Sequence, residues 1–253
     1  MLNIALNTFR ELKRNKILYM ILFFGILLIV FSIALASLSL GQTEKIILDF
    51  GLAMIEVFGL VSVIFIGSQL IFNEINGKTI YLILSKPISR FEFILGKFLG
   101  FALILAFIVF FQTVIFLAIV FYTKTSFDLL IIFSIIFIYL KLLILFAIIL
   151  FFSTFVSSIL AIVLTIIVYI ISHGITSIID MAARSNNYLM LQLGKILYVT
   201  FPNFEALNIK NLILSPVKIE PTYLIFNSAY GLVYLAIILG LTIVIFNRKT
   251  FEN

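Results

Sequence analysis

The chain has 253 residues, a formal net charge of +6, and a composition that is 64% hydrophobic but only 11% charged. An ordinary soluble domain has roughly a quarter of its residues charged, more than twice the fraction in this chain. Together with a mean hydropathy of +1.30, this excludes an ordinary soluble domain. The absence of cysteine excludes disulfides and thiolate metal sites. The composition therefore indicates an integral α-helical membrane protein.

The first residues, "MLNIALNTFRELKRNK", predict an amphipathic helix over residues 1–16. Its apolar residues recur at steps of three and four: Leu2, Leu6, Phe9 and Leu12. Arg10 and Arg14 occupy another face, as in helices that lie on a membrane surface. The helix is either a lipid anchor alone or an anchor whose basic face also contacts a partner. The apolar run behind it is too long for a cleaved signal, so we expect a retained span.

Six segments are long and apolar enough to cross a bilayer core, which requires about 20 residues per helix. They are Ile17–Leu40, Leu48–Phe72, Phe98–Phe121, Leu129–Phe152, Phe155–Ile179 and Thr222–Phe246. Only "FFSTFVSS" interrupts the fourth and fifth, which predicts a tight hairpin. The expected fold is an all-α integral membrane protein with six transmembrane helices, an N-terminal interfacial helix, and one transmembrane domain over residues 1–253.

Lysine and arginine in the loops predict the orientation of the chain. With the N-terminus inside, ten of these residues lie in cytoplasmic segments and six lie outside. Both termini are therefore expected in the cytoplasm. The excess positive charge suits anionic lipids of the inner leaflet and does not require nucleic acid.

Residues 73–97 form the largest cytoplasmic segment between spans. Its "GKT" ends like a phosphate-binding loop, but the first glycine of that loop would fall at Phe72, so the spacing argues against nucleotide binding. Periodicity predicts a short helix, the proline of "SKPIS" a turn, and "RFEFILGK" the entry into the next helix. This segment is too small to fold alone, so it is either a docking element or a solvated connector.

The predicted outside region, residues 180–221, is too apolar for a free loop. It is also too broken by Gly194, Pro202 and Asn203 for a simple span. Short helices that dip into the outer leaflet fit this pattern, because irregular backbone is tolerated only where protein or water covers it. The alternative is a seventh span through residues 188–201, which would move the C-terminus outside.

Glu56 and Lys141 are ionisable residues inside predicted spans. A charge at mid-bilayer costs about 2.5–3.5 kcal/mol on insertion scales, so each should face protein or water. Their depths differ by an amount that a lysine side chain can bridge, which favours a structural ion pair. The alternatives are that both residues line a polar translocation path, or that each charge is accommodated independently by its own local contacts.

The fifth span is expected to carry small residues at four-residue steps: Ser153, Ser157, Ala161 and Thr165. Such a stripe lets helices approach closely, either within the chain or at a dimer interface. Ala236 and Gly240 form a shorter equivalent in the sixth span. His173 is the only histidine and, without a cluster of other ligands, it does not predict a metal site. Likewise, Met181 and Met190 are too few to indicate copper handling.

The cytoplasmic segment carries a family resemblance. Its Glu74, Gly77 and Thr79, together with "LILSKPISR", Phe93 and "GKFLG", closely resemble the first cytoplasmic loop of ABC-2 type transporter permeases. The order of surface helix, two spans, this loop and four further spans is also similar. "FPNFEALNIKN" before the last span resembles the subgroup of multicopper-enzyme maturation permeases, which includes the permease of nitrous-oxide-reductase maturation.

The resemblance implies a permease subunit without ATPase chemistry in a prokaryotic inner membrane. It would bind no cofactor itself, since ATP and Mg would belong to two separate cytoplasmic ABC ATPase subunits, and its other partners would be a second permease copy and membrane lipids. The residues expected to dock the ATPase are Arg10, Arg14, Glu74, Gly77, Lys78, Thr79, Pro87 and Arg90. The importer "EAA…G" loop does not occur, which favours export or extrusion. An ATP-independent channel or carrier, or a relay to an extracytoplasmic maturation partner, is the alternative.

Overall fold

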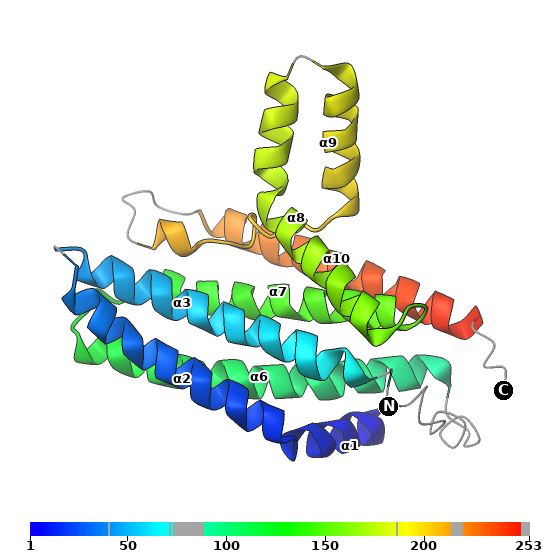
Figure 1. Cartoon of the computed structure of the whole chain (residues 1–253), viewed down its shortest axis with the longest axis horizontal. Coiled ribbons are helices and arrows are strands. Elements are labelled where there is room, and N and C mark those ends of the chain that lie inside the picture. Colours follow the sequence, from blue (N-terminus) through cyan, green and yellow to red (C-terminus); the bar gives the residue numbers. More distant parts are fainter. Residues whose placement is uncertain (40, 71, 73–88, 186, 214–219, 249–253) are drawn as a thin grey trace.

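The computed structural model describes residues 1–39, 41–70, 72, 89–185, 187–213 and 220–248, which form a bundle of long helices with a projecting arm (Figure 1). Six helices in this described part are long and apolar enough to cross a membrane. They are α2 (Lys16–Ser37), α3 with its π-helical extension η1 (Thr43–Gly67), α6 (Arg90–Tyr122), α7 (Leu129–Ser153), α8 (Ser158–Arg184) and α10 (Pro221–Arg248). Each overlaps one predicted span, so the predicted all-α, six-span fold is confirmed.

The described part also contains three shorter elements: α1 (Leu2–Lys13), α9 (Tyr188–Thr200) and the 3₁₀ turn η2 (Lys210–Leu212). At 13 residues, α9 is well short of the ~20 that a span requires. Its C-cap, Phe201, has extended backbone, and Pro202 follows directly. The alternative of a seventh span through residues 188–201 is therefore wrong.

Short polar side chains define where several helices begin. The Asn15 side chain accepts a hydrogen bond from the backbone N–H of Ile17 at 2.9 Å and starts α2. Asp128 starts α7 in the same way, accepting from Leu130 at 3.0 Å. These caps satisfy N–H groups that the first turn of a helix leaves free, so the chain breaks between helices at these polar residues.

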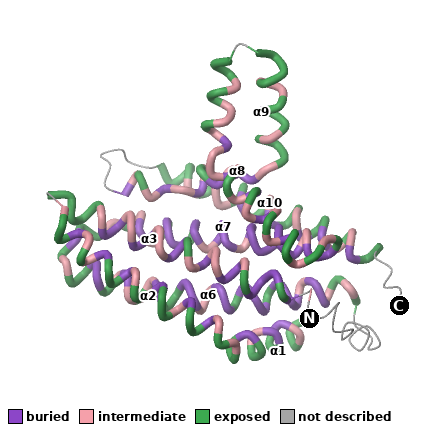
Figure 2. The backbone as a smooth tube through the Cα atoms, in the orientation of Figure 1, coloured by how far each residue is buried: buried purple, intermediate pink, exposed green. Residues whose placement is uncertain are grey.

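Helix α7 lies at the centre of the bundle (Figure 2) and packs against α3, α6, α8 and α10. In its most apolar stretch, 72% of the residues are buried, against 28% for α2 and α8 and 22% for α10. A helix that is apolar on every side is suited to such a central position. The three outer helices instead leave large apolar faces for lipid or for another protein.

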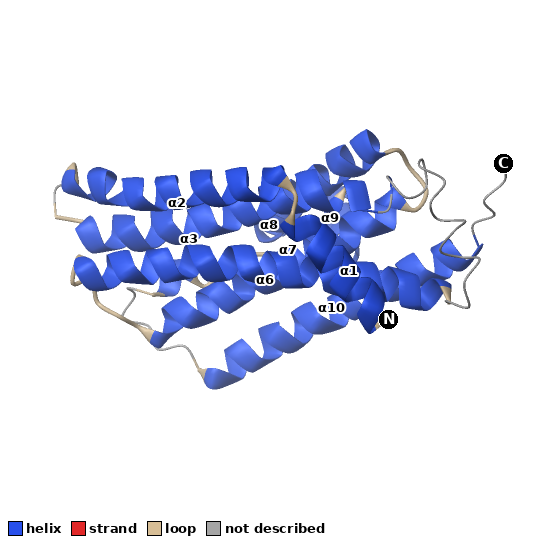
Figure 3. Cartoon of the chain, turned by 90° about the horizontal axis from the view of Figure 1, so that it is seen from below, coloured by secondary structure: helices blue, strands red, loops and turns tan. Residues whose placement is uncertain are grey.

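The N-terminus and the end of α10 lie at one end of the bundle, close to the start of α6 (Figures 1 and 3). The α2–α3 and α6–α7 turns lie at the opposite end. This arrangement agrees with an even number of spans.

The predicted stripe of small residues is divided between two helices. Ser153 is the last residue of α7, not part of the fifth span, because Thr154 donates its hydroxyl to the carbonyl of Phe151 and closes that helix. Ser157 is the exposed N-cap of α8. Ala161 and Thr165 do lie on α8 and are fully buried within the chain. Their burial matches packing within one chain rather than a dimer interface.

Candidate functional site: a buried ion cluster and the start of helix α6

Glu56 and Lys141 meet in the middle of the bundle. Lys141 is the central residue of α7, and Glu56 lies next to the centre of the α3–η1 span. Their side chains are only 5% and 1% exposed, and the Lys141 Nζ lies 2.5 Å from Oε1 of Glu56. The ion pair proposed from the sequence is therefore present, and it joins the central helix to α3.

The same carboxylate binds two further groups. The ammonium of Lys210, in η2, lies 2.6 Å from the other oxygen, Oε2. His173 of α8 places its Nε2 3.2 Å from Oε1 and its Nδ1 3.0 Å from the carbonyl of Tyr169. A neutral imidazole donates from only one of its nitrogens at a time, so in that state His173 donates to one of these two oxygens. Glu56 thus connects α3 with α7, α8 and η2.

Lys210 reaches the cluster because residues 201–213, here called the inserted segment, fold into the bundle. Phe204, Leu207 and Ile209 of this segment are at most 1% exposed. The backbone N–H of Phe204 donates to the carbonyl of Ser172 at 3.1 Å, directly beside His173. Burial of these apolar side chains stabilises the insertion and carries Lys210 to Glu56.

Polar contacts hold the irregular backbone of the inserted segment. The side chain of Asn203 accepts from the N–H groups of Glu205 and Ala206, both at 3.1 Å, and forms a local turn. Tyrosines of α10 complete the contacts: the Asn203 N–H donates to the Tyr230 hydroxyl at 2.8 Å, and Tyr234 donates to the Thr200 carbonyl at 2.9 Å. Irregular backbone is thus covered by protein, as the bilayer environment requires.

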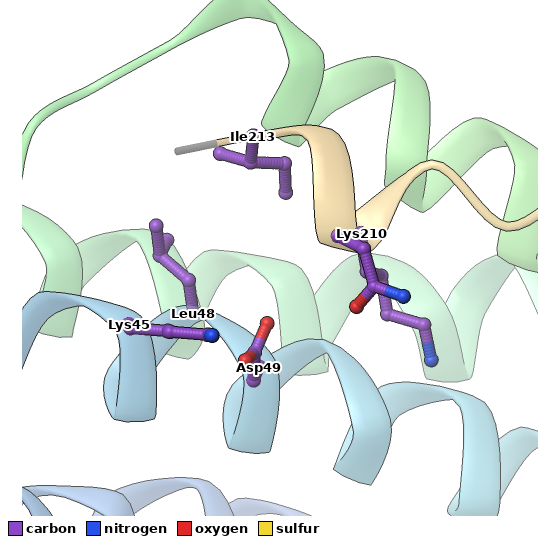
Figure 4. A pocket seen from close by; sticks show the side chains of 6 residues that line it. Lys45, Leu48, Asp49, Lys210 and Ile213 are labelled. Carbon is purple, nitrogen blue, oxygen red and sulfur yellow. The ribbon is translucent and has the colours of Figure 1, made fainter. Parts of the chain in front are cut away.

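A small pocket lies beside the cluster, nearer the start of α3 (Figure 4). Lys45, Leu48 and Asp49 line it from α3, and Lys210 and Ile213 from the inserted segment. Asp49 and Glu56 are seven residues apart and therefore share one face of α3. The pocket continues the polar strip of α3 from the buried cluster toward the end of the bundle.

The cluster contains one carboxylate and two ammonium groups, and it shows no nucleophile paired with a base. Within the described residues, no group of three or more His, Cys, Asp or Glu side chains could hold a metal ion. An unpaired charge in this environment is costly, so the three ionic groups fix the relative positions of the elements that carry them. We interpret the cluster as a structural latch between the inserted segment and the spans.

The start of α6 forms a second group of contacts, on which α1 lies. A Cβ at Gly96 would lie 2.7 Å from the Cβ of Ile4, and a Cβ at Gly100 would lie 2.6 Å from the Cβ of Thr8. Real side chains do not approach so closely, so the glycines of "GKFLG" permit α1 to pack directly on α6. The motif that carried the family resemblance thus has a structural reason here.

A capping box fixes the first turn of α6. The Ser89 hydroxyl accepts from the Glu92 N–H at 3.2 Å, and the Glu92 carboxylate accepts from the Ser89 N–H at 3.3 Å. The N-terminal amine of Met1 lies 3.6 Å from the same carboxylate. The chain terminus, α1 and the start of α6 therefore form one connected unit.

Arg90, one of the predicted docking residues, also contacts α10. Its guanidinium donates to the carbonyls of Phe246 and Asn247 at 2.9 and 3.0 Å. A cation at this position complements the negative end of the α10 dipole. Arg90 thus joins the start of α6 to the end of the last span.

The other predicted docking residues fall into two groups. Arg10 and Arg14 are exposed, on the side of α1 away from its buried Ala5, Thr8 and Leu12. The remaining residues lie outside the described part of the chain: Glu74, Gly77, Lys78, Thr79 and Pro87.

The predicted apolar face of α1 is partly wrong. Leu2 and Leu6 are exposed, but Leu12 is 6% exposed and packs into the protein core. The physical reason is the close contact with α6, which takes the side of α1 that carries Ala5, Thr8 and Leu12. Two residues are left to face lipid at that helix, beside the exposed basic face.

Sequence reasoning did not find His173 and Lys210 as members of the cluster. The available signal for Lys210 was its position in a loop too apolar to be free, which already predicted that the loop is covered by protein. For His173 the signal was its depth in the fifth span, near that of Lys141 in the fourth. The folding back of the inserted segment, which brings Lys210 to Glu56, has no signature in the sequences of the helices that it contacts.

A family model described as "ABC-2 family transporter protein" matches residues 2–251 of the chain. No individual curated protein matches it. The family model does not address the maturation-permease subgroup, so that finer resemblance stays a prediction. The bundle of six spans, the surface helix on α6 and this match over nearly the whole length agree, and the chain belongs to the ABC-2 family of transporter proteins.

Proposed function

We propose that this chain couples ATP hydrolysis by separate ATPase subunits to export or extrusion of a substrate across an inner membrane. As a member of the ABC-2 family, it is the multi-pass membrane permease of an ABC transporter and is not itself catalytic. ATP and Mg would be bound by the partner subunits. Both termini would face the cytoplasm, and a second permease copy and surrounding lipids would complete the assembly.

The observation that carries this proposal is the connected unit at one end of the bundle. There, α1 packs on Gly96 and Gly100 of α6, and Arg90 joins α6 to the end of α10. Residues 73–88, which resemble a coupling loop, enter α6 at this same point. A push by an ATPase on α1 or on this loop would move two spans together, since packed helices transmit displacement as rigid bodies.

Charge supports the same surface as a docking site. Arg10 and Arg14 are exposed on α1 while its opposite side is buried against α6. Such a face can contact a cytoplasmic subunit while Leu2 and Leu6 remain at the lipid surface.

The test is gentle extraction of the tagged protein from its native membrane, followed by identification of the proteins that co-purify. Wild type, Glu74→Lys and Arg10→Glu would be compared. Lys124→Glu is the matched control for Arg10→Glu, because it makes the same charge change at an exposed residue of the α6–α7 turn, at the opposite end of the bundle.

A stoichiometric cytoplasmic ATPase is expected with wild type and the control, and its loss is expected with the two other variants. If wild type is recovered without an ATPase in several mild detergents, the coupling proposal is wrong. An ATP-independent channel or carrier would then be the function to test.

A further inference from the structure

The last part of α8 and the whole of α9 stand side by side as an arm, comprising residues 175–185 and 187–200. Figure 1 shows this arm projecting away from the bundle, across the direction in which α2, α3, α6 and α7 run. Gly194 of α9 lies against Ala182 of α8, where a Cβ would be 3.2 Å away, so the two helices of the arm pack on each other. Most of its large apolar side chains are exposed, including Met181, Leu193 and Val199.

The depth at which the arm leaves the bundle is set by the ion cluster. His173, directly before the arm, contacts Glu56, and Glu56 contacts Lys141. Lys141 is the central residue of α7 and Glu56 is adjacent to the centre of its span. Because these spans cross the bilayer along their length, the arm extends sideways from near the middle of the membrane.

The arm carries charges that lipid alone would not accommodate. Asp180, Arg184 and Lys195 are exposed on it, and no ion pair joins any of them to another described residue. Charged side chains in hydrocarbon are costly and are normally paired or turned to protein or water. The arm therefore requires a protein cover that offers both positive and negative charge.

The arrangement of these charges fits a second copy of the same chain. Asp180 and Arg184 are one helical turn apart, with Ala182 halfway between them and turned toward α9. Around a two-fold axis at the level of Ala182, two antiparallel α8 ends would place Asp180 of each copy beside Arg184 of the other. An interface in which one patch meets itself must be self-complementary, and this sequence satisfies that condition.

We propose that the arms of two copies pack antiparallel across a two-fold axis, with reciprocal Asp180–Arg184 ion pairs. This inference rests on the two-copy assembly of the proposed function and assigns it an interface. The arm of each chain would reach outside its own bundle and be covered by the other.

The charge pattern permits a test in native membranes. Two differently tagged copies are expressed together, and recovery of one tag with the other measures association. Asp180→Arg gives a copy with two positive charges on this face, and Arg184→Asp gives a copy with two negative charges. Each variant alone should associate about tenfold or more weakly than wild type, because like charges then face each other. Together, the two variants should associate as well as wild type.

A second measurement identifies the surface directly. Since the chain has no cysteine, Ala183→Cys introduces a single thiol beside the proposed axis, and a short bismaleimide should join two copies. Phe24→Cys is the matched control, because it introduces a thiol on the exposed face of α2, away from the arm, and should not cross-link. Size-exclusion profiles of all variants establish that they are folded, and Asp180→Arg/Arg184→Asp in one chain should restore association.

Three results would overturn the interface. The first is that both single variants associate like wild type. The second is that Ala183→Cys reacts with a membrane-impermeant maleimide and does not cross-link, so that the arm lies in water. The third is that the mixed variants fail to associate. If wild-type copies never co-purify, the two-copy assembly itself is wrong, whereas loss of the co-purifying ATPase would contradict the coupling function instead.

Discussion

The contacts in the buried cluster predict that loss of the Glu56 carboxylate destabilises the protein more than loss of the Lys141 ammonium. Glu56→Gln leaves the ammonium groups of Lys141 and Lys210 without the carboxylate that both contact. Lys210 is 17% exposed and can turn outward, but Lys141 is 1% exposed and cannot. Removing one partner of a buried ion pair costs about 3–5 kcal/mol, so we expect a loss of that size.

Lys141→Met should be milder. Glu56 would keep Lys210 at 2.6 Å and His173 at 3.2 Å, so the variant loses one charge-assisted hydrogen bond, about 1.5–3 kcal/mol, and also removes a buried charge. The double variant Glu56→Gln/Lys141→Met removes the stranded ammonium. It should therefore be more stable than Glu56→Gln alone, as replacement of a whole buried pair is often close to neutral.

The assay is the midpoint of thermal unfolding in one detergent, read as the loss of the monodisperse peak after heating. For a chain of this size, about 1 kcal/mol corresponds to roughly 2–4 °C, so Glu56→Gln should fall by roughly 6–20 °C. Two results would refute the reasoning: Glu56→Gln with an unchanged midpoint, or a double variant as unstable as the two single losses added together.

Three further changes test other contacts. Gly100→Leu should displace α1 at a cost of about 1–3 kcal/mol and abolish ATPase co-purification. Gly240→Leu is the control, because a Cβ added there has no atom within 4 Å, and it should retain co-purification. Equal behaviour of the two variants would contradict a role for close packing of α1 on α6. Ser89→Ala should cost about 1 kcal/mol and speed amide exchange in the first turn of α6 only, so unchanged exchange there would count against the capping box. Lys210→Met removes the charge-assisted hydrogen bond to Glu56, which contributes about 1.5–3 kcal/mol. The inserted segment should then be released more often, and amide exchange around Phe204 should be roughly tenfold to a hundredfold faster. Exchange at the wild-type rate would show that the apolar contacts alone hold the segment.

Much of the architecture was predictable because the bilayer imposes simple requirements on sequence. Six apolar runs predicted the six spans, and Asn15 and Asp128 stand where the helices begin. Glu56 and Lys141 could be paired in advance, since their depths in the second and fourth spans differ by an amount that a lysine side chain can bridge. The boundary error at Ser153 arose inside one continuous apolar run, where composition does not distinguish the end of a helix from its continuation.

What the sequence by itself determined is therefore local or one-dimensional: the membrane environment, the spans and the presence of buried charge. The tertiary structure alone decided which residues share a site. Lys210 joins Glu56 because residues 201–213 fold back into the bundle, at a sequence separation of 154 residues, and His173 joins it from α8. Similarly, the requirement for glycine at positions 96 and 100 is apparent only from the packing of α1 against them. Contacts between distant segments depend on the packing of the whole chain, whereas insertion and helix formation depend on the neighbours of each residue.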